Sequence, residues 1–114
     1  MEQILLVLTN LPDTASAQSL ARVLVESRLA ACVNLMPGVQ SFYRWQGAIE
    51  QANEVTLLIK TTRRHYVQLQ QAIISHHPYE VPEVIAMPVT DGHPAYLRWV
   101  ATETLSDPAA DDHA

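Results

Sequence analysis

The spacing of hydrophobic residues changes several times along the chain, and each change predicts a new structural element. A wholly apolar run at Ile4–Leu8 predicts a strand that is buried on both faces. Pro12 interrupts the apolar pattern, and Asp13 or Thr14 is placed to cap a helix. This helix is predicted because apolar residues then recur on one helical face, at Ala17, Leu20, Ala21, Leu24 and Val25.

Two further extended stretches predict a long β-hairpin. Leu29–Leu35 is apolar, Val39–Trp45 continues it, and Gln46-Gly47 is typical of a turn. Glu54–Lys60 then alternates between two faces, as expected for a strand that returns along the first one. Because a proline has no amide hydrogen for the ladder, the hairpin is expected to bend or bulge near Pro37-Gly38.

A second helix is predicted from about Arg63 to His77. Thr61 or Thr62 is expected to cap this helix, and Pro78 ends it because proline cannot continue a helix. Its apolar stripe is formed by Tyr66, Leu69 and Ile73, with Val67, Ala72 and Ile74 beside them.

A fourth extended segment is predicted at Val81–Thr90. Pro82 and Pro88 exclude this segment from a central position in a sheet. After a turn at Asp91-Gly92, Pro94 suits the first position of a third helix. The apolar side of that helix is expected to contain Tyr96, Leu97, Trp99 and Val100.

The order of these elements predicts the fold class. It is α+β, a ferredoxin-like βαββαβ sandwich with a long β-hairpin and a C-terminal helix. Another α+β sandwich built from the same elements is the alternative. The predicted hairpin, Leu29 to Thr61, spans about thirty residues, whereas strands usually run about 3–10 residues. Its far end carries Phe42, Tyr43 and Trp45, so we expect the hairpins to pack on neighbouring chains in a homo-oligomer.

Composition limits the organisation and the partners of the chain. Its 114 residues suit one domain, predicted at residues 1–105, followed by a disordered acidic tail at 106–114. With 7 Lys and Arg residues, 12 Asp and Glu residues and a net charge of −5, neither nucleic acid nor a membrane surface is an expected partner. The single cysteine and the absence of a positively charged leader favour a cytoplasmic protein.

The densest group of functional side chains lies at residues 76–83. His76, His77 and Glu83 offer two imidazoles and a carboxylate, which suit a metal ion. The alternative is that the histidines simply finish the helix and interact with its negative end. Cys32 lies in an apolar run and is expected to be structural.

Lys60 is the only lysine of the chain. It ends an apolar strand, where it can bind an anion, pair with a carboxylate such as Glu54 or Glu83, or reach solvent. The sequence contains no glycine-rich phosphate loop, no serine elbow and no HExxH motif. We therefore do not expect an enzyme.

Taken together, four stretches resemble CutA, the divalent-cation tolerance protein family. The stretches are LAACVN at 29–34, YRWQG at 43–47, residues 54–61, and HHPYEVPE at 76–83. The similarity covers about residues 4–105. It implies a ferredoxin-like protomer, a homotrimer assembled by long hairpins and similar to PII-type signalling proteins, and binding of copper or another divalent cation.

The resemblance also implies a set of metal ligands. The family's histidines and glutamate fall on His76, His77 and Glu83, and the family's cysteine position falls on Thr9. Because thiolate is what selects Cu(I), Thr9 predicts weak binding, with imidazole and carboxylate left to hold Cu(II) or Zn(II).

A PII-like small-molecule sensor or signalling scaffold is the alternative function. In that case Trp45, Lys60, Tyr79 and Glu83 are expected to line a cleft between subunits. Aromatic rings with one cation and one carboxylate suit a small anionic or zwitterionic ligand.

Overall fold

The computed structural model describes residues 2–104, so the predicted tail at 106–114 lies outside the described residues. The elements follow the predicted order and end with the expected helix. They are β1 (Ile4–Leu11), α1 (Thr14–Glu26), β2 (Cys32–Trp45), β3 (Ala48–Thr62), the 3-10 turn η1 (Arg63–His65), α2 (Tyr66–His76), β4 (Ile85–Pro88) and α3 (Pro94–Glu103).

The four strands form one antiparallel sheet in the order β2-β3-β1-β4. This arrangement confirms the α+β, ferredoxin-like prediction. β4 lies at an edge and pairs with β1 from Leu5–Pro88 to Leu8–Ile85, as its prolines required. The predicted length of this strand was wrong, because only four of the residues at 81–90 enter the sheet.

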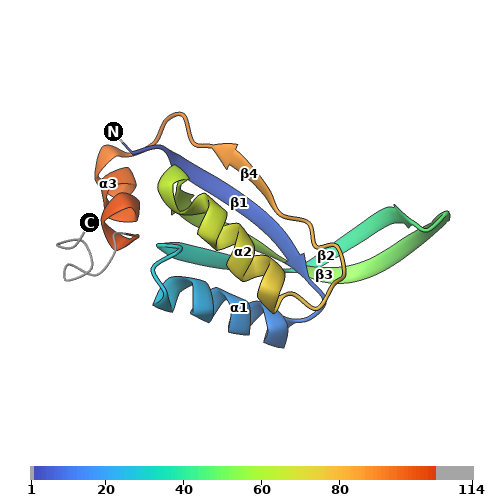
Figure 1. The fold of residues 1–114 in the computed structure, drawn as a ribbon. Coiled ribbons are helices and arrows are strands. Elements are labelled where there is room, and N and C mark those ends of the chain that lie inside the picture. The colour runs from blue at the N-terminus through green and yellow to red at the C-terminus, as the bar shows by residue number, and fades with distance from the viewer. Residues whose placement is uncertain (1, 105–114) are drawn as a thin grey trace.

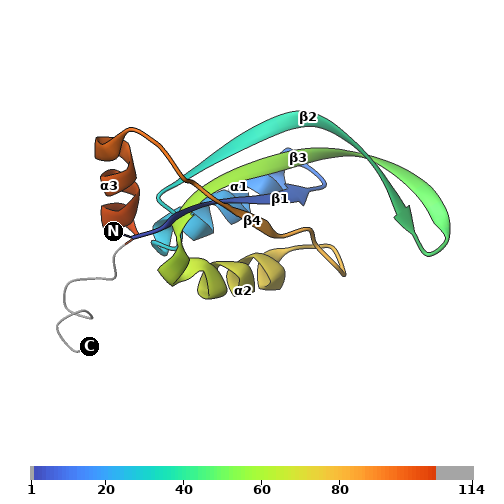
Figure 2. The ribbon, with the colours of Figure 1, turned by 90° about the horizontal axis from the view of Figure 1, so that it is seen from above.

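Helices α1 and α2 cover one face of the sheet (Figures 1 and 2). The core lies between these two helices and the sheet. It consists of buried aliphatic side chains, among them Leu5, Val7, Leu57, Ile59, Leu20, Leu24, Leu69 and Ile73. The predicted helical stripes were therefore largely right. Val25 of α1 and Val67 and Ile74 of α2 are exceptions, since they are 42%, 65% and 49% exposed.

The starts of the two long helices differ from each other. α1 is capped as predicted, because Asp13 accepts a 2.7 Å hydrogen bond from the backbone amide of Ser16. Thr62, one of the two residues predicted to cap the second helix, is the N-cap residue of η1, but its side chain makes no capping hydrogen bond, and the N-cap residue of α2 itself is His65. The hydroxyl of Thr61 donates to the carbonyl oxygen of Leu29, and Thr62 contacts the ring of His65, so the chain enters α2 through a 3-10 turn instead.

The opposite face of the sheet is covered by α3 only at one end. There Val100 packs with Ile4 and Ala31 in a small second core. Tyr96 and Trp99, which we expected to pack inward, are 40% and 43% exposed and contact each other at a ring distance of 5.6 Å. Beyond α3 this face, here called the open face, carries half-buried or exposed apolar side chains: Leu6, Leu8, Met36, Leu58, Ile85 and Met87.

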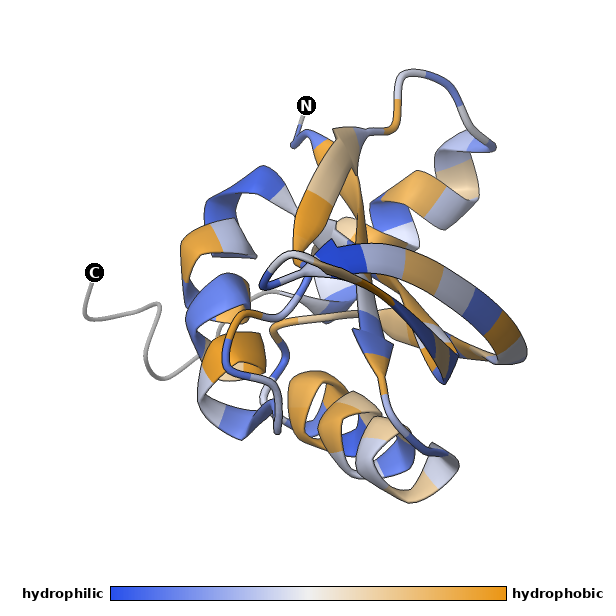
Figure 3. Cartoon of the chain, turned by 90° about the vertical axis from the view of Figure 1, so that its right-hand side faces the viewer, coloured by the Kyte–Doolittle hydropathy of each residue, from blue (hydrophilic) through white to orange (hydrophobic). Residues whose placement is uncertain are grey.

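β2 and β3 extend beyond the sheet as an arm, and the molecule measures 51 × 29 × 23 Å (Figures 1 and 2). The pairing shifts between Met36 and Val39, where Gly38 takes a φ of +77°, which confirms the predicted bulge. The arm turns at Gln46-Gly47, as predicted. Seen end-on, it alternates hydrophobic and hydrophilic residues (Figure 3).

Candidate functional site

A cleft of about 790 Å³ lies at the base of the arm. One of its walls is the segment between α2 and β4, here called the crossing segment, which passes in front of the base of the arm in the view of Figure 1. Its walls come from four parts of the chain. β1 supplies Asn10, β2 supplies Phe42, Tyr43 and Trp45, β3 supplies Glu54, and the crossing segment supplies residues 78–83.

Tyr79 and Glu54 join the crossing segment to the arm. The hydroxyl of Tyr79 donates a 2.8 Å hydrogen bond to Oε2 of Glu54, whose surface is only 7% exposed. Burial raises the pKa of Tyr79 above its usual range, and the hydrogen bond and charge of Glu54 raise it further. The phenol therefore keeps its proton at neutral pH and acts as a donor.

His77 is buried, and both of its ring nitrogens are engaged. Nε2 lies 2.6 Å from the carbonyl oxygen of Asn10, which can only accept, so Nε2 donates. Nδ1 accepts a 3.1 Å hydrogen bond from the backbone amide of Tyr79. The ring also packs against that of Tyr79 at 4.8 Å. No lone pair of this imidazole is left for a metal ion in the observed arrangement.

His76 is exposed and has a different environment. Its Nδ1 lies 2.8 Å from the carbonyl oxygen of Ala72, so this nitrogen donates. Nε2 has no hydrogen-bond partner among residues 2–104. The two adjacent histidines therefore have separate roles, since only His76 offers an available ring nitrogen.

Glu83 and Thr9 lie on different sides of β1. Nδ2 of Asn10 donates to Oε1 of Glu83 at 3.3 Å, and Oδ1 of Asn10 accepts from Thr56 at 2.6 Å. Because neighbouring side chains of a strand alternate, Thr9 points to the helices instead. It is fully buried there, and its hydroxyl has no partner among the described residues.

The expected metal ligands thus do not converge within one chain. In the part of the chain that the structure describes, no three His, Cys, Asp or Glu side chains are placed to hold one ion. His77 is engaged through both nitrogens, and Thr9 is on the far side of the strand from Glu83. The residues present do not fit a closed metal site of three protein ligands.

The expected ligand-binding residues are brought together in part. Trp45, Tyr79 and Glu83 all line the cleft, whereas Lys60 does not. Lys60 lies six residues along β3 from Glu54, about 20 Å away, and its Nζ donates to Oδ1 of Asn34 on the open face. Within one chain Lys60 therefore does not belong to this cleft, and its place in a cleft between subunits stays a prediction.

Cys32 is half-buried near the same end of β2 as Asn34. Burial raises the pKa of the Tyr96 hydroxyl, and the neighbouring Cys32 raises it further. The thiol therefore contacts α3 and lies away from the cleft, in agreement with a structural role.

Sequence reasoning missed two residues of the cleft. Asn10 holds Glu83, and Glu54 is the buried partner of Tyr79. The signal for Glu54 was a charged residue at the start of the alternating run Glu54–Lys60, at a position where the strand is already buried. Asn10 gave no signal, because the apolar run that predicted β1 ends at Leu8.

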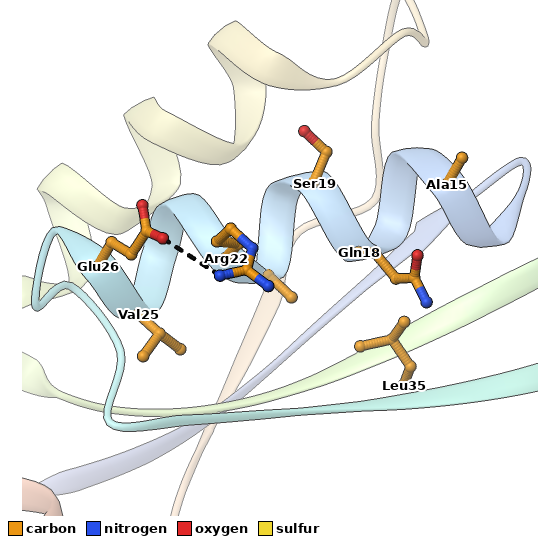
Figure 4. Close-up of a pocket in the computed structure, with 8 residues that line it drawn as sticks. Ala15, Gln18, Ser19, Arg22, Val25, Glu26 and Leu35 are labelled. Carbon is orange, nitrogen blue, oxygen red and sulfur yellow. Dashed lines mark hydrogen bonds and ion pairs between the residues drawn. The ribbon is translucent and has the colours of Figure 1, made fainter.

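A second hollow, of about 640 Å³, lies between α1 and β2 (Figure 4). Arg22 and Glu26 cross part of it with an exposed ion pair of 3.4 Å, and Val25 and Leu35 form its apolar side. It has no aromatic lining and no buried polar group, so the cleft at the arm is the stronger candidate.

Among residues 2–104, no helix has the length and the hydrophobicity that crossing a membrane requires.

Comparison with known proteins agrees with the fold. The family model described as CutA1 divalent ion tolerance protein matches residues 5–103. The divalent-cation tolerance protein CutA of Thermus thermophilus is 42% identical over 104 residues, which cover 91% of this chain and 99% of that protein.

Solved structures show the same relationship. CutA from Xylella fastidiosa has a TM-score of 0.87 and 46% identity, covering 89% of this chain and 97% of that one. A CutA from Archaeoglobus fulgidus, described as a periplasmic divalent cation tolerance protein, has a TM-score of 0.85 and 30% identity, covering 92% and 100%. On the family match and these identities, the chain belongs to the CutA divalent ion tolerance protein family.

Proposed function

We propose that this chain acts in divalent-cation tolerance as a non-enzymatic homotrimer in the cytoplasm. The observation that supports the assembly is the surface that one chain leaves uncovered. The open face presents Met36, Ile85 and Met87 at 41–51% exposure, and the arm presents Phe42 and Ile49 at 66% and 71%. Large apolar surfaces of this kind are typical of interfaces between protein chains.

The arm and the open face belong to one hairpin, because β2 and β3 continue from the sheet into the arm. Alternation along β3 places Phe42 and Ile49 on the side of this hairpin opposite to Leu58, so both sides of it carry uncovered apolar side chains. Leu8 pairs with Leu58 on one side and with Ile85 on the other, so the apolar side chains lie in rows across the sheet. An arm that reaches a neighbour can cover such a row with its own apolar residues. Covering it would remove from water a surface that the helices of one chain do not reach.

The assembly is tested by light scattering coupled to size-exclusion chromatography at micromolar concentration. The expected mass is that of three chains of 12.7 kDa. A mass of one chain under these conditions would contradict the proposal. The apparent stability should also rise with protein concentration, because assembly is linked to folding.

For metal binding, we propose that copper or another divalent cation binds through Nε2 of His76. This atom is supported by its exposure and by the absence of a partner among residues 2–104. His77 and Glu83, expected beside it, are engaged with β1. One imidazole per chain supports weak binding, in agreement with a threonine at residue 9.

Isothermal titration calorimetry with Cu(II) and Zn(II) tests which of the two histidines, His76 or His77, binds the metal ion. His76→Ala should abolish the binding heat, whereas a folded His77→Ala variant should retain it. Equal loss in both variants would contradict the assignment, and no heat with the unaltered protein would contradict metal binding itself.

A second candidate function, a PII-like small-molecule sensor, is favoured by the cleft. Trp45, Tyr79 and Glu83 come from distant parts of the chain and line one hollow of about 790 Å³, a size that suits a small ligand. A thermal-shift screen of metabolites tests this candidate. The absence of any stabilising compound, together with intact copper binding, would count against it.

A further inference from the structure

Within one chain, the charged side chains that line the cleft are all acidic. Three carboxylates, those of Glu54, Glu80 and Glu83, belong to its lining, and no Lys, Arg or His residue does. The one lysine is held at Asn34, on the open face. An anionic ligand would therefore meet only negatively charged side chains of the described residues in this cleft. The cleft of one chain thus disfavours anionic ligands, which a lysine in its lining would have attracted.

The carboxylate of Glu54 is the one whose burial costs the most free energy without a cationic partner. It is more than nine-tenths buried, and its one hydrogen bond within residues 2–104 comes from the neutral hydroxyl of Tyr79. It forms no ion pair with any of the described residues. A buried carboxylate without a cationic partner is costly, so an incoming positive charge would relieve an existing penalty.

Aromatic rings form the other wall of the cleft. Tyr43 and Trp45 share the side of the hairpin that carries Glu54, and they are 46% and 39% exposed, so their ring faces are not buried in the core of the chain. Ring faces attract cations through the quadrupole of the π system, most strongly for tryptophan. Aromatic faces opposite carboxylates are the arrangement that recognises an organic ammonium group.

We propose that the cleft at the base of the arm binds a small organic cation, with a quaternary or protonated ammonium group between the ring of Tyr43 and the carboxylates of Glu54 and Glu83, and with Trp45 further along the same wall. A metal ion is less suitable here, because the described part of the chain places no three acidic, histidine or cysteine side chains around one point. The inference rests on the second candidate function, the small-molecule sensor, and specifies the class of its ligand.

Choline is a suitable probe, with 3,3-dimethylbutan-1-ol as its neutral isostere and benzoate as an anion. Binding is followed by tryptophan fluorescence in a Trp99→Phe background, so that Trp45 alone reports. Choline should bind saturably and at least tenfold more tightly than the isostere, and benzoate should not bind. Equal binding of choline and its isostere, or tighter binding of benzoate, would overturn the proposal.

Variants locate the charge that matters. Glu54→Gln keeps an acceptor for Tyr79 and should weaken choline binding at least tenfold, as should Glu83→Gln to a smaller extent. The matched control is Glu26→Gln on α1, whose side chain is exposed and away from the cleft, and it should leave choline binding unchanged. No change in either cleft variant would overturn the proposal.

Light scattering of the same samples separates this inference from the proposed assembly. A trimer that ignores choline would overturn the organic-cation site and leave the assembly standing. A monomer that binds choline as predicted would do the reverse. Saturation of the site by Cu(II) in place of choline would also overturn the proposal, because it would assign the cleft to a metal ion.

Discussion

The ring of His77 ties the end of α2 to the end of β1 through a 2.6 Å hydrogen bond from Nε2 to the carbonyl oxygen of Asn10. We predict that His77→Ala lowers the free energy of unfolding by about 1–3 kcal/mol, because it removes the partner of a part-buried carbonyl and of the amide of Tyr79. Urea denaturation measures the change. His76→Ala, at the exposed neighbour, is the control and should change stability by no more than about 0.5 kcal/mol.

A second prediction concerns the hydroxyl of Tyr79. Tyr79→Phe removes the hydrogen bond to the buried carboxylate of Glu54 and should lower the free energy of unfolding by about 1–3 kcal/mol. Tyr66→Phe is a matched control, since that hydroxyl donates a bond of the same 2.8 Å length to Gln70 within one helix. Chemical denaturation should show the smaller loss for Tyr66→Phe. Equal losses in the free energy of unfolding would mean that the hydrogen bond to the buried Glu54 stabilises the fold no more than the one to Gln70.

The fold was predictable where a pattern repeats over several residues. The stripe of α1 and the alternation of β3 each place many side chains on one face, so one misjudged residue such as Val25 does not change the result. β4 was harder to predict because its length depends on pairing with β1, which is a contact between residues about eighty positions apart. Local propensity contains no information on such pairing.

The site was predictable only in its composition. Residues 78–83 of the dense segment do line the cleft, but the sequence could not show that His77 turns to Asn10 or that Lys60 lies about 20 Å from Glu54. Those outcomes depend on sheet register and on how the crossing segment meets the arm. A cluster of polar residues in the sequence therefore predicts where a site lies better than it predicts which side chains contact each other within that site.

A third prediction follows from His65, which is buried beside Thr62. Burial lowers the pKa of His65 below its ordinary value of 6.5, the charge of Arg64 lowers it further, and Glu2 partly opposes them. The unfolded chain therefore takes up a proton first as the pH falls, so stability should be complete above about pH 6.5 and decrease below it. Thermal unfolding from pH 8 to 5 tests the direction.

The His65 contribution is isolated by comparing two variants. His65→Gln should weaken the loss of stability below pH 6.5, whereas His93→Gln, at an exposed position before α3, should keep it. Identical pH profiles for the two variants would show that other groups cause the loss.

The last prediction tests the arm as the surface of assembly. Ile49 lies near the tip of the arm, pairs with Arg44 across it and is 71% exposed. Ile49→Ser should shift the assembly towards smaller species, because the apolar side chain would no longer be removed from water at an interface. Sedimentation velocity over a concentration series measures the shift.

Val67 supplies the control for this experiment. It is also β-branched and 65% exposed, but it lies on the outer side of α2, away from the arm and the open face. Val67→Ser removes a similar apolar surface, so any general effect of a serine on solubility or on the unfolded state appears in both variants. If the two variants sediment alike, the arm is not the surface that joins the chains. If only Ile49→Ser dissociates, the length of the hairpin is explained by what it covers on a neighbour.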